Sequence, residues 1–212
     1  NVGKDRYYNW TVRNAPRYRN PTDDELLKIE RALGELGVGV VDFEPSPEEF
    51  EKFRSEDFIE PAYHGGRAGG VWDEKLVEHW ISAQLLGLER FTSQDIYVDV
   101  AACGSPWVRT LRERFGLQAF AIDLAVDQAF STLPYYRAEN ATRTSFGDQS
   151  VRGASLHCAF EMFVRDDDTQ LIDELARILV PGGKAVIVPL YMHTHYYAYS
   201  TPEYFGAGFV DP

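Results

Sequence analysis

A turn built of small residues, followed about 20 residues later by an aspartate, lies in the middle of the chain. The apolar run at residues 97–100 ends in the segment Ala101–Gly104, where small side chains let a ligand approach the backbone. The helical segment that follows points its N-terminal N–H groups toward the same place. A second apolar run ends in Asp123, about 20 residues further on, where a carboxylate can bind both hydroxyls of a ribose. The pattern predicts a βαβ unit that binds a nucleoside.

Acid–base candidates follow two later apolar runs. In an open α/β sheet, ligands bind beyond the carboxyl ends of the strands, so groups placed there are expected to face the ligand. A base that takes a proton from a hydroxyl or an amine must lie within hydrogen-bond reach of it. The candidate catalytic residues are Glu161, after the run at 154–159, and Tyr191, His193 and His195, after the run at 185–188.

The pair His193 and His195 has three interpretations: metal ligands, acid–base or substrate contacts, and ordinary surface histidines. An extended segment with no carboxylate or cysteine close by is a poor ligand set, so we assign no metal. The neighbouring tyrosines also leave three interpretations open. They could line an acceptor pocket, pack against the N-terminal segment, or form a contact in a homodimer; they are Tyr191, Tyr196, Tyr197 and Tyr199.

The elements that must position these groups alternate between strand and helix patterns. Strands are expected at 97–100, 118–123, 135–139, 154–159 and 185–188, with helices at 107–115 and from Asp166 to the turn Pro181-Gly182-Gly183. This alternation predicts a parallel, doubly wound α/β sheet whose last run is fully buried. Within it, His157 is expected to be a hydrogen-bonded core residue and Asp99 to order the neighbouring loop.

The N-terminal part predicts a helical extension at residues 1–62, ahead of a main domain at 63–212. Residues 1–20 read as an irregular arm, and capping boxes at Thr22–Glu25 and Ser46–Glu49 each open a helix. A short β-like run is expected at 38–43. The glycine-rich segment Gly65–Gly70 is either a linker or a mobile lid. The amphipathic helix at 72–86 follows, and its tryptophans are expected to be core residues.

Net charge, hydropathy and cysteine content limit the kinds of partner and the cellular location that the sequence predicts. The formal net charge of −12 argues against binding a nucleic-acid backbone, which needs clustered Lys and Arg. No apolar run approaches the roughly 20 residues that span a bilayer, and no signal-peptide pattern opens the chain. Two cysteines far apart in the sequence, Cys103 and Cys158, do not make a disulfide framework. A cytoplasmic protein is the expectation.

Over roughly residues 70–190 the chain resembles the class I S-adenosylmethionine-dependent methyltransferases, of the methyltransferase type 11 kind. The resemblance depends on Val98–Gly104, Asp123, Asn140-Ala141 and the turn that begins at Arg177 and ends in Pro181-Gly182-Gly183-Lys184. It implies a Rossmann-like sheet of seven strands with S-adenosyl-L-methionine as cofactor. The residues it assigns to the cofactor are Ala101, Ala102, Cys103, Gly104, Asp123, Asn140, Ala141, Cys158 and Phe160.

Two features depart from the family pattern. Family members carry D-x-G-x-G-x-G at the first loop, whereas Ala101 and Ala102 stand in place of the leading glycine here and Ser105-Pro106 follows Gly104. We therefore expect an altered backbone path in this loop. The chain also ends soon after the fifth predicted strand. A fragment without its C-terminal strands, an incomplete sheet, and a sheet completed by a partner are the alternatives.

The sequence thus predicts a methyltransferase that acts on a small molecule or a cell-envelope glycan precursor. One alternative is a non-catalytic, methyltransferase-like domain that binds a nucleoside or a partner protein, which the altered loop favours. A nicotinamide-dependent oxidoreductase is disfavoured because G-x-G-x-x-G is absent and the Pro-Gly-Gly turn is present.

Overall fold

The computed structural model describes residues 21–57, 63, 72–102, 104–190 and 192. The chain divides into two compact units, one made of residues 44–190 and the other of residues 1–43 with 191–212. Each unit is described by itself below. The boundary between residues 62 and 63 that the sequence suggested stays a prediction.

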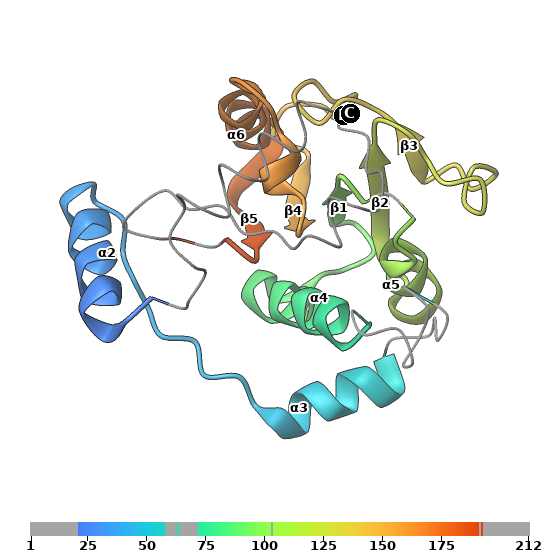
Figure 1. The fold of residues 1–212 in the computed structure, drawn as a ribbon. Coiled ribbons are helices and arrows are strands. Elements are labelled where there is room, and N and C mark those ends of the chain that lie inside the picture. Colours follow the sequence, from blue (N-terminus) through green and yellow to red (C-terminus); the bar gives the residue numbers. More distant parts are fainter. Residues whose placement is uncertain (1–20, 58–62, 64–71, 103, 191, 193–212) are drawn as a thin grey trace, which may run out of the picture. The chain divides into compact units, whose positions relative to one another are not determined.

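A five-stranded parallel sheet is the centre of the larger unit (Figure 1). Its strand order is β3-β2-β1-β4-β5, so the chain builds outward from β1 on one side and then crosses to the other side. The strands are β1 (Ile96–Val100), β2 (Gln118–Asp123), β3 (Tyr136–Ala138), β4 (Val151–His157) and β5 (Leu179–Val188). The order reverses between β1 and β4, and such a switch point is where open α/β sheets bind ligands.

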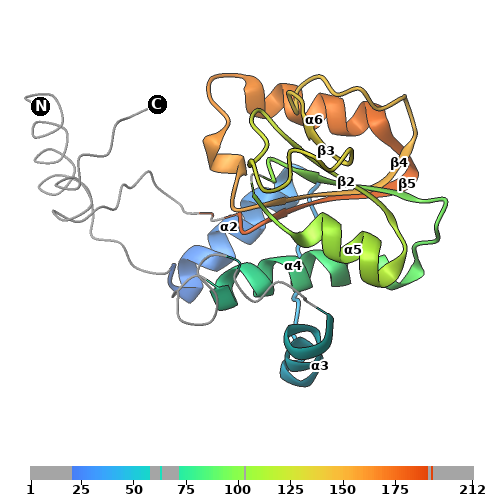
Figure 2. The same cartoon turned by 90° about the vertical axis from the view of Figure 1, so that its right-hand side faces the viewer.

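Helices cover both faces of the sheet (Figure 2). On one face lie α4 (Trp72–Leu86) and α5 (Trp107–Phe115), and on the other lies α6 (Asp167–Ile178). Adjacent side chains of a strand point to opposite faces, and accordingly Tyr97 packs with α4 and α5 whereas Val98 packs with α6. The predicted doubly wound α/β fold is confirmed.

The aromatic residues of α4 are core residues, as predicted. Trp72 and Trp80 are buried, and the ring of Trp80 lies 5.6 Å from that of Phe50. Phe50 belongs to α3 (Pro47–Lys52), which Ser46 caps by accepting a hydrogen bond from a backbone N–H. The chain continues from α3 as a short π-helix, η1 (Phe53–Asp57), which buries Phe53 against the sheet unit.

The fifth strand corrects two predictions. It begins at Leu179, so the Pro-Gly-Gly turn lies inside the strand's bounds, beside a register shift between Val151 and Gly153. It is also half-buried to exposed along its length, because it lies at an edge of the described sheet. Gly183 has a packing reason: a Cβ there would lie 2.9 Å from the carbonyl oxygen of Val180 and 3.0 Å from that of Arg152.

Arg177, the first residue of that turn motif, joins α6 to the loop before β4. Its guanidinium donates to Glu174 at 2.7 and 2.8 Å, to Asp148 at 2.5 Å and to the carbonyl of Phe146 at 2.9 Å. Glu174 also accepts from the backbone N–H and hydroxyl of Thr144. These contacts, with Arg177 first, lower the pKa of Glu174 to about 2. The motif residue therefore has a structural role.

The described part of the smaller unit contains one helix, α2 (Asp23–Glu35), with the predicted capping box between Thr22 and Glu25. No strand forms at residues 38–43, which contradicts the β-like run expected there. All six residues are exposed, and no strand of the described residues pairs with them to form a ladder of hydrogen bonds.

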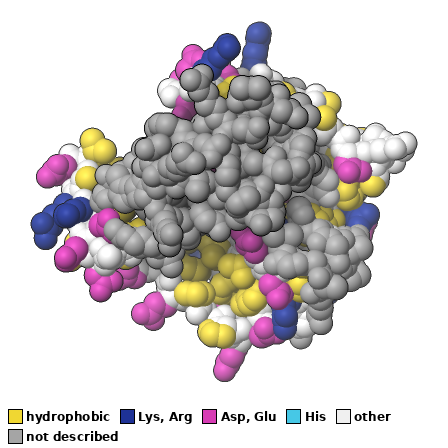
Figure 3. Space-filling model, in the orientation of Figure 1, with side chains coloured by type: hydrophobic (Ala, Val, Ile, Leu, Met, Phe, Trp, Pro, Cys, Tyr) yellow, Lys and Arg dark blue, Asp and Glu magenta, His cyan; other side chains and the backbone are white. Residues whose placement is uncertain are grey.

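Acidic side chains are spread over the surface. In the view of Figure 3 they recur among apolar side chains, and Lys and Arg occupy a few places, in keeping with 33 acidic and 21 basic residues in the chain. Within the described ranges, none of the helices has the length and apolar character needed to cross a bilayer.

Candidate functional site

The predicted cofactor residues that the structure describes follow the carboxyl ends of β1 to β4. Parallel strands bring these ends to one edge of the sheet. Ala101, Ala102 and Gly104 follow β1, and Asp123 ends β2. Asn140 and Ala141 come after β3, and Cys158 and Phe160 after β4. Their part in cofactor binding remains a prediction.

The loop after β1 contains a strained residue where the family pattern has glycine. Ala101 has a φ of +54°, in the left-handed region that costs an alanine about 1–2 kcal/mol. The turn is closed by two backbone hydrogen bonds, from Ala102 to the carbonyl of Ile122 at 3.1 Å and from Ser105 to that of Ala102 at 2.8 Å. The backbone thus takes a conformation suited to glycine although the residue is alanine.

The C-terminal end of the same loop contacts β3, the first residue of α5 and the side chain of Asp127. The hydroxyl of Tyr136, on β3, donates to the carbonyl of Ser105 at 2.7 Å, and the Ser105 hydroxyl accepts from the N–H of Trp107 at 3.2 Å. Gly104 packs on the side chain of Asp127, whose Oδ2 would lie 3.3 Å from a Cβ at that position. These contacts fix the position of this part of the loop.

Asp123 and Asn140 offer complementary hydrogen-bonding groups at the ends of neighbouring strands. Asp123 is half-buried, and its Oδ1 accepts from the N–H of Ala125 at 3.2 Å. The Asn140 side-chain oxygen accepts from both the N–H and the hydroxyl of Thr142, at 2.9 and 3.0 Å. With both lone pairs of that oxygen used, the Asn140 amide presents donors to any ligand.

A buried polar chain joins β1, β4 and α4. His157 Nδ1 lies 3.0 Å from Asp99 Oδ1, and His157 Nε2 lies 3.0 Å from the hydroxyl of Ser82. The ring of His79 lies 4.1 Å from that of His157 and stacks on Trp107 at 5.2 Å. The prediction that His157 is a hydrogen-bonded core residue is confirmed. Asp99 was expected to order the loop, but its carboxylate instead pairs with the neighbouring strand.

The hydrogen bonds from Ser82 through His157 to Asp99 have the connectivity of a Ser–His–Asp catalytic triad, but the burial of these side chains argues against nucleophilic catalysis. A nucleophilic serine must reach its substrate, and Ser82 is 0% exposed in the middle of α4. Asp99 is 1% exposed, and its Oδ2 makes no hydrogen bond within the described structure. We therefore interpret these buried hydrogen bonds as structural contacts that hold β1, β4 and α4 together.

A second polar group lies at the end of β4. The Lys75 ammonium donates to both carboxylate oxygens of Glu78, at 2.9 and 3.1 Å, with both side chains largely buried. The Cys158 thiol donates to Glu161 Oε1 at 3.4 Å, and Lys75 is close enough to act on the thiol electrostatically. Burial, opposed in part by Lys75, raises the pKa of Cys158, so the thiol stays protonated at neutral pH.

Four of these polar residues were missed by the sequence reasoning, namely Lys75, Glu78, His79 and Ser82. Their spacing of i, i+3, i+4 and i+7 marks one face of a helix and was the signal available. The tryptophans and leucines of α4 form an apolar stripe beside this polar face, and in the sequence the apolar stripe is the more conspicuous of the two.

Several candidates lie outside the described residues: Cys103, Tyr191, His193, His195 and the segment Gly65–Gly70. The structure therefore does not test them. Among the residues that are described, no three His, Cys, Asp or Glu side chains are grouped so that they could hold a metal ion.

Comparison with known proteins finds a family model that matches part of the chain. Residues 98–187 match the family model described as "Methyltransferase domain", which confirms the resemblance inferred from the motifs. No curated protein matches the chain.

Solved structures also match. One is the geranyl diphosphate C-methyltransferase of Streptomyces coelicolor A3(2), with 21% identity, coverage of 81% of this chain and 56% of that one, and a TM-score of 0.46. Another is a methyltransferase in complex with the Haloferax volcanii Trm112 methyltransferase activator, with 24% identity, coverage of 65% and 58%, and a TM-score of 0.42. A third is the PH0226 protein of Pyrococcus horikoshii OT3, with 17% identity, coverage of 65% and 64%, and a TM-score of 0.44. The chain thus spans roughly half to two thirds of the length of these proteins.

Proposed function

We propose that this chain, whose residues 98–187 form a methyltransferase domain, binds S-adenosylmethionine and transfers its methyl group to a small-molecule acceptor. The observation that carries the proposal is the juxtaposition of the small residues that follow β1 with Asp123, which ends the neighbouring strand β2. S-adenosylmethionine supplies an electrophilic methyl group on a sulfonium when it is bound. A cell-envelope glycan precursor remains a candidate acceptor.

The residues present suit the cofactor. The Asp123 carboxylate can accept hydrogen bonds from a pair of ribose hydroxyls. The Asn140 amide, with its oxygen used by Thr142, would donate to a ring nitrogen of adenine and would not accept from the amino group. The small residues after β1 leave the backbone accessible, and Cys158 and Phe160 would border the methionine end.

Glu161 is the described residue best placed to act as a base. It follows β4 in the short 3₁₀ helix η4 (Phe160–Met162), is exposed, and is oriented by the Cys158 thiol. Its carboxylate can take the proton of an acceptor hydroxyl or amine as the new bond to the methyl carbon forms. Orientation of the acceptor for in-line attack supplies much of the remaining rate. Tyr191, His193 and His195 remain further candidates for contact with the acceptor.

The alternative is a non-catalytic domain of the same fold that binds a nucleoside or a partner protein. The strained Ala101 in place of glycine supports this alternative, because it departs from the usual loop. We further propose that the protein works in the cytoplasm, that nucleic acid is not its substrate, and that the tyrosine-rich segment after β5 could form a homodimer contact.

Calorimetric titration of the purified chain with S-adenosylmethionine and S-adenosylhomocysteine tests the proposal, with NAD as the control ligand. We expect micromolar binding of both sulfur nucleosides, weakened at least tenfold by Asp123→Asn, a loss of about 1.4 kcal/mol. Asp173→Asn, an exposed change on α6, is the matched control and should leave both affinities unchanged. Absence of binding to a folded sample would overturn the enzyme proposal in favour of the non-catalytic domain.

If the chain binds both nucleosides, an acceptor screen follows, with release of S-adenosylhomocysteine as the readout. With a responsive acceptor, Glu161→Gln should lower kcat by about 10²–10⁴-fold, the usual contribution of a general base. The affinity for S-adenosylhomocysteine should not change in this variant, because the carboxylate is assigned to the acceptor.

A further inference from the structure

We propose that Lys75 and Glu78 of α4, together with Cys158 and Glu161, form the acceptor subsite, and that this subsite excludes anionic acceptor groups. The inference rests on the proposed function and adds the class of acceptor. The group that enters the subsite would be uncharged, such as a hydroxyl, and would not be adjacent to a phosphate or carboxylate.

Lys75, the cation among the described residues of this cluster, is already paired with Glu78. The side chain of Lys75 is 13% exposed and that of Glu78 is 4% exposed, and the ammonium contacts both carboxylate oxygens. Burial acts against the charged form of Lys75, yet the contact with Glu78 raises its pKa above the ordinary value. Burial raises the pKa of Glu78, and the contact with Lys75 opposes that shift. The ammonium and the carboxylate are hydrogen-bonded to each other, so as an ion pair they contribute no net charge.

The other two residues of the proposed subsite, Cys158 and Glu161, together carry a negative charge. Cys158 has a left-handed backbone with a φ of +49°, held by a hydrogen bond from its N–H to the carbonyl of Val188 at 2.8 Å. Its thiol is neutral and donates to Glu161, so it adds no positive charge that could attract an anion. Within the part of the chain that the structure describes, the Glu161 carboxylate is thus the charge of the subsite that has no counterion.

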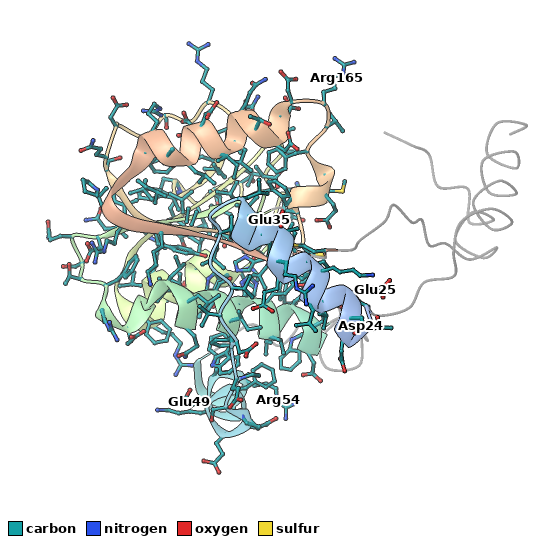
Figure 4. All side chains as sticks on the ribbon, turned by 90° about the vertical axis from the view of Figure 1, so that its left-hand side faces the viewer. Asp24, Glu25, Glu35, Glu49, Arg54 and Arg165 are labelled. Atoms are coloured by element: carbon teal, nitrogen blue, oxygen red, sulfur yellow. The ribbon has the colours of Figure 1, made fainter. Side chains whose placement is uncertain are left out.

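Among the described residues, Glu161 forms no ion pair with a cation, and it accepts its hydrogen bond from the Cys158 thiol. The next basic residue along the chain, Arg165, is exposed in the loop before α6 and extends into solvent (Figure 4). A phosphate or carboxylate placed at Glu161 would meet a like charge near the protein surface, which disfavours its binding. An uncharged hydroxyl meets no such penalty.

His157 is the positioning residue that brings the two halves of the subsite together. It precedes Cys158 on β4 and binds Ser82, which lies on the same face of α4 as Lys75 and Glu78. Its second hydrogen bond, to Asp99, fixes the ring between β1 and α4. The polar face of α4 is therefore held against the end of β4, where Cys158 and Glu161 begin.

The step that follows from this arrangement balances in atoms and charge. The O–H bond of the acceptor breaks and its proton passes to the Glu161 carboxylate, while a C–O bond forms to the methyl carbon. The C–S bond breaks and its electron pair returns to sulfur. One negative and one positive charge disappear together, so the subsite becomes neutral as the sulfonium does.

The charge of the subsite can be measured through the partly exposed Cys158 thiol without knowing the acceptor. Three methanethiosulfonate reagents with the same reactive group are compared: trimethylammonioethyl, hydroxyethyl and sulfonatoethyl. Rates at Cys158 are read by mass spectrometry of its peptide, which separates them from rates at Cys103, and are divided by rates with 2-mercaptoethanol. We expect the cationic reagent to react at least tenfold faster than the anionic one, with the neutral reagent between them.

The ratio of cationic to anionic rates should fall at least threefold in Glu161→Gln and stay unchanged in Asp173→Asn. The ratio cancels any change in the pKa of the thiol, because all three reagents attack the same thiolate. Equal rates for the two charged reagents, or a ratio unaffected by Glu161→Gln, would overturn the proposal. The measurement needs no bound nucleoside, so its failure is distinct from a failure of the nucleoside titration.

Discussion

His157 Nδ1 lies 3.0 Å from Asp99 Oδ1, so β1 and β4 are joined by a buried side-chain hydrogen bond in addition to their backbone ladder. Both side chains are nearly inaccessible to water, with exposures of 6% and 1%. The switch point of the sheet, where the ligand is expected, is thus built around a polar pair. A buried carboxylate without a partner is costly, which makes this pair a requirement of the fold.

Replacing His157 by leucine should destabilise the chain strongly. The substitution removes both hydrogen bonds of the imidazole and leaves the Asp99 carboxylate buried beside an apolar side chain. We expect a loss of about 3 kcal/mol in the free energy of unfolding, measured by urea denaturation.

Asp99→Asn is the matched comparison for that variant. An amide can still hydrogen-bond to the imidazole and carries no buried charge, so we expect a loss below about 1.5 kcal/mol. The double variant Asp99→Asn/His157→Leu should be more stable than the sum of the single losses predicts, because no buried charge is stranded. Additive losses would contradict the coupling.

Ala101→Gly should stabilise the chain by about 1 kcal/mol, because glycine adopts the observed φ of +54° without steric cost. The neighbouring Ala102→Gly is the control, since Ala102 is not among the residues with positive φ. It should be destabilising by about 0.5–1 kcal/mol through the greater entropy of the unfolded chain. Thermal denaturation of both variants checks the prediction, and loss of stability in Ala101→Gly would contradict the strained loop.

Gly183→Ala should cost about 2 kcal/mol, because its new methyl group would press on two backbone carbonyls that cannot turn aside. Gly147→Ala is the matched control: its Cβ would have Ser150 as nearest neighbour, at 3.9 Å. We expect its effect to stay within about 0.5 kcal/mol. Equal urea midpoints for the two variants would show that the strand around Gly183 adapts.

Stability should fall in acid through Glu174. Its pKa in the folded protein is about 2, below the ordinary value of 4.5, so the unfolded chain binds the proton first. The stabilising effect is therefore fully present above about pH 4.5 and is lost as the pH falls toward 2. Urea unfolding of Glu174→Gln at pH 7 and at pH 3 should show a smaller deficit relative to the parent chain at pH 3.

Asp173→Asn, next to Glu174 but exposed, is the control and should lose stability in parallel with the parent chain. A deficit of Glu174→Gln that is the same at both pH values would mean that Glu174 acts through packing and not through its charge.

Local patterns in the sequence were enough for the fold of the larger unit. Helix α4 has the bounds that its apolar spacing predicted, and β2 ends at Asp123 as expected, because both elements are set by residues a few positions apart. The Asp123 position and the small-residue turn after β1 could likewise be located by motif and spacing. The run at 38–43 failed as a strand because a strand also needs a partner, which its own residues do not specify.

Tertiary structure alone decided what the polar residues do. Asp99 and His157 are far apart in sequence, and only the adjacency of β1 and β4 brings them within hydrogen-bond distance. Ser82 joins them because α4 lies across that part of the sheet. From the sequence alone, most elements of the larger unit could be predicted and a candidate position for a nucleoside could be proposed, since periodicity and turn chemistry are local. The pairing of buried charges depended on which strands become neighbours, and that is a property of the whole fold.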